Sequence, residues 1–399
     1  MQRQILTNMK QPLRFPEGLT AERFLAEYWQ QKPLLFRQAL PGFDCHLQPD
    51  ELAGLACEAD VESRLVLEKG GKSPWESRHG PFREEEFTRL PESHWTLLVQ
   101  DVDKHVPEVA RLLDHFRFLP DWRLDDVMVS YAADQGSVGP HCDDYDVFLY
   151  QARGKRRWRV HSQPVSEADF IPGLELRILP SFATEQEWLL EPGDMLYLPP
   201  NLAHWGVAEG ECMTCSVGFR APSFHELVSA WCDELLDYRI PSGRYRDPAL
   251  QPRQASAEIG PEVLEEIHRL LHEFLDTDGE RQRSWFGRYI TETKENLAVE
   301  PAESPLEPLQ FLNRFRSLGR IQRNSYTRLA FSRGNAGQDS LFVNGREYLI
   351  PSEEGEFLPV ITHYRELHFG YLENWLAMPD YLQLVCDLYN DGHFLFPHE

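Results

Sequence analysis

Residues 120–220 alternate short apolar segments with turn residues, and this pattern constrains the fold more than any other feature of the chain. Residues 126–131 alternate polar and apolar side chains, as a half-buried strand does. Turn residues recur at 134–137, 153–155 and 191–194. Between them the sequence predicts further strands at 143–150, 156–160, 195–198 and 212–219. Many short strands with regular turns indicate a sandwich or a small barrel, and we expect a double-stranded β-helix, the jelly-roll or cupin-like barrel.

A histidine and an aspartate, His141 and Asp143, lie near the start of the second of these strands. Side chains two residues apart in a strand point to the same face, so we expect both on one face. His204 follows about 60 residues later, after a Pro-Gly-Asp turn and a strand. Two histidines and one carboxylate form the facial triad of non-haem Fe(II) oxygenases. We therefore predict that these residues bind Fe(II); the simpler alternative is a core histidine beside a surface acid.

An iron site of this kind leaves positions open for O2 and for a bidentate 2-oxoacid. The cosubstrate 2-oxoglutarate also carries a distal carboxylate, which requires a cation inside the barrel. Arg156 shares the apolar face of the next strand with Trp158 and Val160. Because arginine binds a carboxylate bidentately and is costly to bury without an anion, Arg156 is predicted to bind 2-oxoglutarate.

The strand at 126–131 offers candidates for a substrate pocket. Asp126, Met128 and Ser130 share one of its faces. If that face points inward, Asp126 places a carboxylate in the substrate channel, which suits a cationic side chain such as arginine. The alternative is that Asp126 only caps the start of the strand. Ser216, on the closing strand, is a further pocket candidate.

Composition restricts the partners and the compartment. The 399 residues carry a formal net charge of −24, which argues against direct binding to a nucleic-acid backbone. An acidic surface suits a basic protein partner, although it can also serve solubility alone. Seven scattered cysteines are typical of a reducing compartment. No apolar run approaches the roughly 20 residues of a membrane span, so we expect a cytoplasmic protein without membrane contact.

Beyond Arg220 the pattern turns helical. Ser223 and Glu226 form a predicted capping box, and further helices are expected from Pro261 and near residues 285–297. Their apolar faces pack either within one chain or against a second copy in a dimer. After a proline-rich linker at 301–308, helices and an Asn-Gly hairpin at 341–348 indicate a winged-helix-like module. Residues 241–256 are expected to form a loop.

Five segments resemble the bacterial JmjC-type ribosomal oxygenases, in particular the ribosomal protein arginine hydroxylases. The segments are PDWRLDD (120–126), GPHCDDYDVF (139–148), KRRWRV (155–160), EPGDMLYLPP (191–200) and SVGFRAP (216–222). The resemblance implies a mainly β, α+β organisation in three parts. These are a JmjC catalytic barrel at 1–221, a helical dimerisation region at 222–300 and a winged-helix-like domain at 301–399. It also implies a homodimer.

The same resemblance implies Fe(II) and 2-oxoglutarate, with His141, Asp143 and His204 as metal ligands and Arg156 on the cosubstrate. It further implies hydroxylation at the β-carbon of an arginine in a large-subunit ribosomal protein, number sixteen. Cys142 in the middle of the triad motif and Trp205 after the distal histidine depart from the family pattern, and the C-terminal domain is the least alike.

Other functions stay open on the residues alone. The same chemistry on a histidine of another ribosomal protein is one, and a neutral, amide-lined pocket would favour it. A demethylase is disfavoured because nothing indicates a methyl-lysine cage. A non-catalytic, metal-binding cupin-like module associated with the ribosome is the alternative from a different class; Arg156 and the intact triad favour the enzyme.

Overall fold

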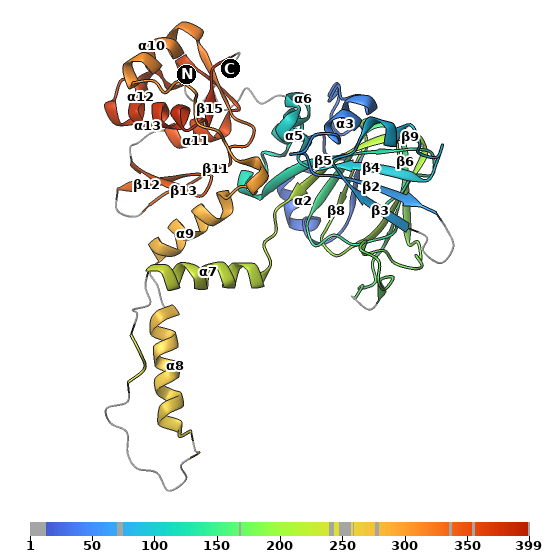
Figure 1. The fold of residues 1–399 in the computed structure, drawn as a ribbon, viewed down its shortest axis with the longest axis horizontal. Coiled ribbons are helices and arrows are strands. Elements are labelled where there is room, and N and C mark those ends of the chain that lie inside the picture. Colours follow the sequence, from blue (N-terminus) through green and yellow to red (C-terminus); the bar gives the residue numbers. More distant parts are fainter. Residues whose placement is uncertain are drawn as a thin grey trace.

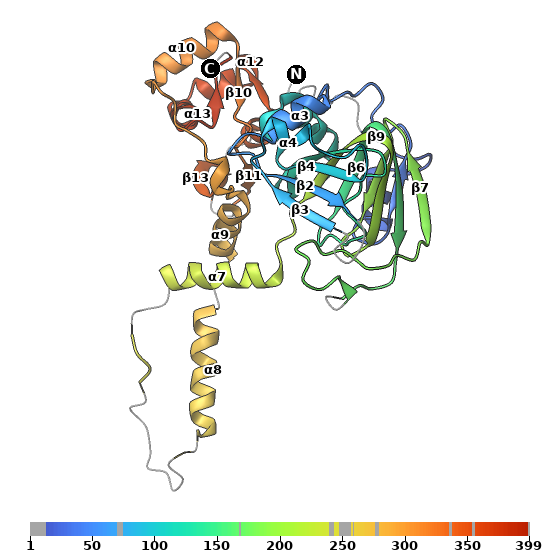
Figure 2. The same ribbon diagram turned by 45° about the vertical axis from the view of Figure 1, so that its right-hand side comes forward.

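The computed structural model describes residues 13–69, 75–166, 169–238, 243–246, 257, 259–275, 279–334, 337–352 and 356–397. The chain forms a β-barrel, a C-terminal unit beside it, and two helices that project away from both (Figures 1 and 2). No described helix is both long enough and apolar enough to span a membrane. The expected loop at 241–256 falls largely outside the described residues.

The barrel is built from one sheet of nine strands in the order β1-β8-β6-β9-β5-β4-β2-β3, with β7 paired to β6. Every pairing in this sheet is antiparallel. The strands are β1 (Leu34–Phe36), β2 (Ser63–Glu68), β3 (Trp75–His79), β4 (Trp95–Val99), β5 (Leu124–Ala132), β6 (Val147–His161), β7 (Gln186–Leu190), β8 (Met195–Leu198) and β9 (Ala203–Phe219). The predicted double-stranded β-helix class is confirmed.

The expected break at 153–155 is wrong, because β6 runs unbroken through it and pairs with β9 along most of its length. The turn residues instead mark register irregularities between Gln151 and Lys155, where Gly154 has a φ of 62°. A β-bulge absorbs an extra residue and bends a strand without ending it. Gly154 therefore allows a long strand to bend and does not mark a hairpin turn.

The N-terminal segments cover one face of the sheet. Thr20 caps the first of them, its side chain accepting from Arg23 N. Residues 107–116 form a short α-helix followed by a 3-10 helix. The elements are α2 (Ala21–Glu27), α3 (Pro49–Leu55), α4 (Glu84–Phe87), α5 (Val102–His105), α6 (Pro107–Ala110), η1 (Arg111–Phe116) and η2 (Asp121–Arg123). They join the sheet in a buried cluster around Phe24, Phe148 and Tyr197. The opposite face of the sheet is thereby left for a cavity.

In the described part of the chain, three helices follow the barrel: α7 (Phe224–Tyr238), α8 (Pro261–Leu275) and α9 (Gly279–Thr291), with the 3-10 turn η4 (Glu295–Leu297) after them. The capping box is confirmed, since Glu226 N donates to Ser223 Oγ at 3.1 Å and Ser223 N to Glu226 Oε2 at 2.7 Å. The last helix, α9, packs on strands β11 to β13 of the C-terminal unit. In both views α8 projects from the end of α7, away from the barrel and the C-terminal unit (Figures 1 and 2).

The C-terminal unit combines four helices with two three-stranded sheets around its own buried core. Its elements are α10 (Pro308–Leu318), β10 (Arg320–Arg323), β11 (Leu329–Ser332), β12 (Gln338–Val343), β13 (Arg346–Pro351), α11 (Phe357–His363), β14 (Glu366–His368), α12 (Phe369–Leu376), α13 (Pro379–Asn390) and β15 (Phe394–Leu395). Strands β12 and β13 form the predicted hairpin, with Asn344 and Gly345 both at positive φ. A winged-helix-like C-terminal domain is confirmed.

Candidate active site

The backbone around His141 brings two distant parts of the chain together. His141 and Asp143 precede β6 and do not lie within it, so the prediction that a strand aligns them is wrong. His141 pairs with His204 as an isolated antiparallel bridge, with N···O distances of 3.0 and 2.9 Å. The carbonyl of Asp143 accepts from Asn201 N at 2.7 Å. These backbone bonds to the start of β9 and to the turn before it fix the loop and therefore place the two ligand candidates.

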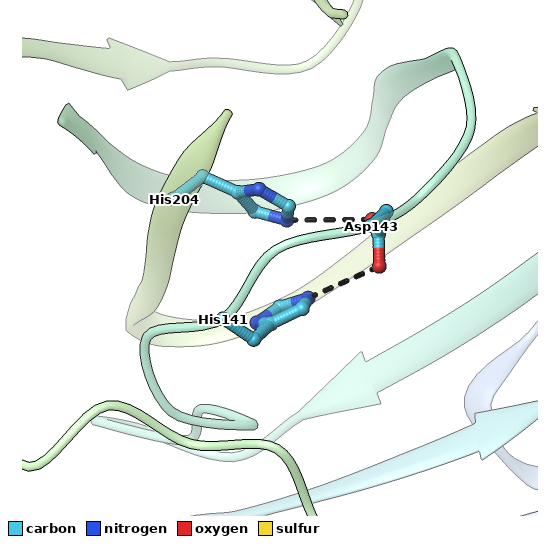
Figure 3. Close-up of side chains that lie close together, drawn as sticks. All are labelled: His141, Asp143 and His204. Carbon is cyan, nitrogen blue, oxygen red and sulfur yellow. Dashed lines mark ion pairs between the residues drawn. The ribbon is translucent and has the colours of Figure 1, made fainter. Parts of the chain in front are cut away.

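The three side chains converge on one point (Figure 3). Asp143 Oδ1 lies 3.8 Å from His141 Nε2, and Asp143 Oδ2 lies 3.6 Å from His204 Nε2. Each histidine places Nδ1 2.9 Å from a backbone carbonyl, that of Gly139 for His141 and that of Leu202 for His204. When Nδ1 carries the proton and donates it to the carbonyl, Nε2 keeps a free lone pair facing Asp143.

Burial and the neighbouring His141 lower the pKa of His204 to about 4, which keeps the imidazole neutral and available as a ligand. One ligand atom from each of the three residues lies within 4.8 Å of the other two. Two imidazole nitrogens and one carboxylate oxygen fit a six-coordinate Fe(II) that keeps three positions open. The donor set thus fits the metal that the sequence predicts.

Arg156 lies on β6 and is buried, with 3% of its surface exposed; it lines the same cavity as the triad. Its Nη1 donates to Ser130 Oγ at 3.3 Å and its Nη2 to the Gly206 carbonyl at 3.4 Å. Its Nε has no hydrogen-bond partner, and the guanidinium forms no ion pair with any described carboxylate. A Cβ at Gly206 would lie 2.8 Å from that Nε. Burial lowers the pKa of Arg156, so the site favours a bound anion that compensates the charge.

One cavity of about 360 Å³ contains the triad, Arg156 and all four predicted pocket residues, Asp126, Met128, Ser130 and Ser216. The alternation in β5 holds, because Val127 and Val129 join the buried cluster on the other face. Ser130 accepts a hydrogen bond from Arg156, so Ser130 lies at the end of the cavity where 2-oxoglutarate is predicted to bind. Ser216 lies opposite Met128 in the β5–β9 register.

Several lining residues were not anticipated from the sequence: Arg64, Thr96, Gln100, Tyr145 and Thr214. Thr214 stands two residues before Ser216 and opposite Ser130, so strand alternation was a usable signal for it. Thr96 Oγ1 and Trp158 Nε1 are buried without a hydrogen-bond partner, and both residues line this cavity. Nothing local in the sequence marks Thr96, because β4 joins the site only through its pairing with β5.

Asp126 forms the acidic wall of the cavity. It lies where the β5–β9 register shifts, and a bulge of this kind re-aims a side chain. Burial, followed by the negative charges of Asp101, Asp103 and Asp125, raises the pKa of Asp126 to about 7. Asp126 Oδ2 accepts from Asp101 N at 3.1 Å and forms no ion pair with a described cation, whereas Asp101 itself pairs with Lys294 at 2.6 Å.

The fold and the site together define a double-stranded β-helix protein with a two-histidine, one-carboxylate centre. A family model described as a JmjC domain matches residues 111–227, and one described as a ROXA-like winged helix matches residues 275–394. The chain is 35% identical to the "Ribosomal protein uL16 3-hydroxylase" of Escherichia coli K12, over 94% of this chain and 96% of that one. It is 36% identical to the "Probable ribosomal oxygenase" of Haemophilus influenzae, over 64% of each chain.

Solved structures agree with these relatives. The X-ray structure of E. coli YcfD superposes with a TM-score of 0.84 at 32% identity, covering 97% of this chain and all of that one. A second, described as YcfD, a ribosomal oxygenase, in complex with cobalt and 2-oxoglutarate, gives a TM-score of 0.81 at 33% identity, with 97% and 99% covered. The chain therefore belongs to the JmjC-type ribosomal oxygenase family.

Proposed function

We propose that this protein is an Fe(II)- and 2-oxoglutarate-dependent hydroxylase that acts on the β-carbon of an arginine in a large-subunit ribosomal protein. The observation that carries the proposal is one cavity lined by the His-Asp-His centre, by Arg156, which forms no ion pair with a described carboxylate, and by Asp126, which forms none with a described cation. The E. coli relative, named a uL16 3-hydroxylase, supports the substrate class.

His141, Asp143 and His204 are the proposed iron ligands, and Arg156 the proposed partner of the distal carboxylate of 2-oxoglutarate. When bound, iron with O2 and 2-oxoglutarate supplies the oxidation that inserts one oxygen atom into a C–H bond. Ser130 holds the Arg156 guanidinium by its 3.3 Å hydrogen bond, and Trp158 lies 5.0 Å from it. The chain thus fixes the cosubstrate at its far end while the triad fixes its reacting end.

The substrate pocket is proposed to run along Asp126, Met128, Tyr145 and Ser216. An ionised Asp126 can accept a guanidinium bidentately, and Met128 offers an apolar surface to the aliphatic stem of an arginine. A histidine substrate would favour a neutral amide partner in place of an unpaired carboxylate. The acidic wall therefore favours arginine over the histidine alternative, and the net charge of −24 suits a basic protein substrate without direct nucleic-acid binding.

A homodimer is proposed to cover the apolar face of α8. Leu264, Ile267, Leu271 and Leu275 lie at helical spacing and are 40–59% exposed. Four exposed aliphatic side chains on one helix face are costly to leave in water. We propose the division 1–221, 222–300 and 301–399 for the chain, and a cytoplasmic location, where ribosomal proteins are made.

The experiment is an intact-mass and fragment analysis of basic ribosomal proteins after incubation with the protein, Fe(II), 2-oxoglutarate and O2. We expect a gain of one oxygen atom on an arginine, absent with the His141→Ala variant. No gain on any candidate while 2-oxoglutarate still binds would leave an oxygenase for another substrate. Neither gain nor binding would favour the non-catalytic metal-binding module.

A further inference from the structure

A second cavity, of about 70 Å³, lies between the barrel and the C-terminal unit and shares no lining residue with the active-site cavity. Residues 104–125 form its barrel wall, and residues 290–365 form the other. Five cationic side chains line it against three carboxylates, although the whole chain carries a net charge of −24; Lys104 pairs at 2.5 Å with Asp103 outside the lining, which leaves four arginines against the three carboxylates. The cations are Lys104, Arg117, Arg323, Arg328 and Arg365, and the carboxylates are Asp114, Asp121 and Asp125.

The three carboxylates are already engaged by three of the arginines. Arg117 contacts Asp114 at 2.8 Å and Asp121 at 3.2 Å. Arg365 approaches the same oxygen of Asp114 at 3.3 Å. Arg328 pairs with Asp125 at 3.2 Å. Asp114 therefore serves two arginines, and its pKa lies below its usual value because of Arg365 and Arg117, in spite of its burial.

Arg323, at the end of β10, is the exception. Its Nη1 donates to the Thr362 carbonyl at 2.9 Å, and it forms no ion pair with a described carboxylate. Burial and the positive charges of Arg365 and Arg117 lower the pKa of Arg323 to about 9, in spite of the opposing negative charges of Asp121 and Asp114. Burial and Arg117 also lower the pKa of the neighbouring His363. The partly buried Arg323 guanidinium lies near Asp114 and Asp121, but both carboxylates are already held by Arg117 and Arg365, so one positive charge of this cluster has no carboxylate of its own.

We propose that this cavity binds a small oxyanion of the phosphate class, held by Arg323 together with Arg117 and Arg365. Guanidinium groups bind tetrahedral oxyanions through paired N–H donors. The volume equals a few water molecules at about 30 Å³ each, which is the scale of a small free ion.

Such an ion bridges the two parts of the chain, because Arg117 comes from the barrel and the other two arginines from the C-terminal unit. The same cavity wall includes Arg328, which also donates to the Leu124 carbonyl at 2.8 Å at the start of β5. Strand β5 carries Asp126 two residues later. Occupation of the site therefore stabilises the contact of the C-terminal unit with the strand that supplies the substrate pocket.

The test is a calorimetric titration of the full-length protein with low-millimolar sodium phosphate at constant ionic strength, together with thermal unfolding. Because phosphate sequesters Fe(II), sodium sulfate is the probe for the iron-loaded protein. We expect saturable binding and a rise in Tm, with Arg323→Met weakening the affinity about tenfold or more. Arg320→Met is the matched control, since Arg320 lies on the same strand, is exposed and pairs with Glu366 at 3.2 Å. It leaves binding unchanged.

Absence of saturable binding by the wild-type protein overturns the proposal, as does equal binding by the Arg323→Met variant. If that variant does not fold, Arg365→Gln makes the same comparison with a side chain that is 26% exposed. A short oligonucleotide added in competition separates the two sources of phosphate. Displacement of the free ion by the oligonucleotide would overturn the free-ion assignment.

Discussion

Asp126 is predicted to make substrate binding depend on pH in the neutral range. Its pKa is raised from 3.8 to about 7, and a cationic substrate binds the ionised carboxylate. The fraction ionised is about one tenth at pH 6 and about nine tenths at pH 8 for such a pKa. The KM for an arginine-containing substrate is therefore expected to fall about tenfold from pH 6 to pH 8. Binding releases a proton, because the cation lowers the pKa of Asp126.

The raised pKa of Asp126 also lowers the folding stability at neutral pH. Its effect on the pH dependence of stability is opposite in sign to that of an acid held in a salt bridge. The folded state holds the proton up to about pH 7, whereas the unfolded chain loses it near 3.8, so stability falls as the pH rises through this window. A shift of about three units corresponds to about 4 kcal/mol as an upper bound. Asp126→Asn should therefore raise Tm at pH 8 and leave it unchanged at pH 3.

The assay is KM and kcat for an arginine-containing ribosomal peptide from pH 6 to pH 8, by mass spectrometry of the product. Asp126→Asn should raise KM at pH 8 about 10- to 100-fold and flatten its pH dependence, since one charged hydrogen-bonded contact is lost. Asp125→Asn is the matched control: its carboxylate pairs with Arg328, so the pH dependence should persist with a slightly lower midpoint. A flat wild-type profile, or an unchanged KM in the Asp126 variant, would refute the reasoning.

Three further predictions concern the cosubstrate, the surroundings of the pocket and the assembly. Arg156→Met should raise the KM for 2-oxoglutarate about tenfold or more, and Arg156→Lys should recover only part of it because the bidentate contact is lost; a KM unchanged in turnover assays would contradict the assignment. Lys294→Met should move the pH midpoint of substrate KM upward, because Lys294 neutralises Asp101 at 2.6 Å beside Asp126, and Lys294→Arg should restore it; an unmoved midpoint would show that the pair is only structural. Leu271→Glu on α8 should convert a dimer into monomers in light scattering after size exclusion, whereas a wild-type monomer would remove the basis for the dimer.

The sequence determined the features whose chemistry is local. Strand alternation placed Asp126, Met128 and Ser130 on one face and Val127 and Val129 on the other, as β5 shows. Alternation likewise placed Arg156 with Trp158 on the inner face of β6. The capping box at Ser223 and the Asn-Gly hairpin also depend on neighbours a few residues apart. Such short-range patterns can be read because the backbone geometry of one element fixes them.

Pairing between distant segments decided the rest. His141 and Asp143 stand in a loop, and the backbone bridge to His204 aligns them where no strand does. Thr96 reaches the cavity only because β4 pairs with β5, and the irregular register near Leu124 aims Asp126 inward. The second cavity, between the barrel and the C-terminal unit, is lined by arginines that lie between residues 117 and 365 of the sequence. The sequence by itself names these side chains, but their distances and desolvation arise when strands and domains pack, since both depend on contacts between residues far apart along the chain.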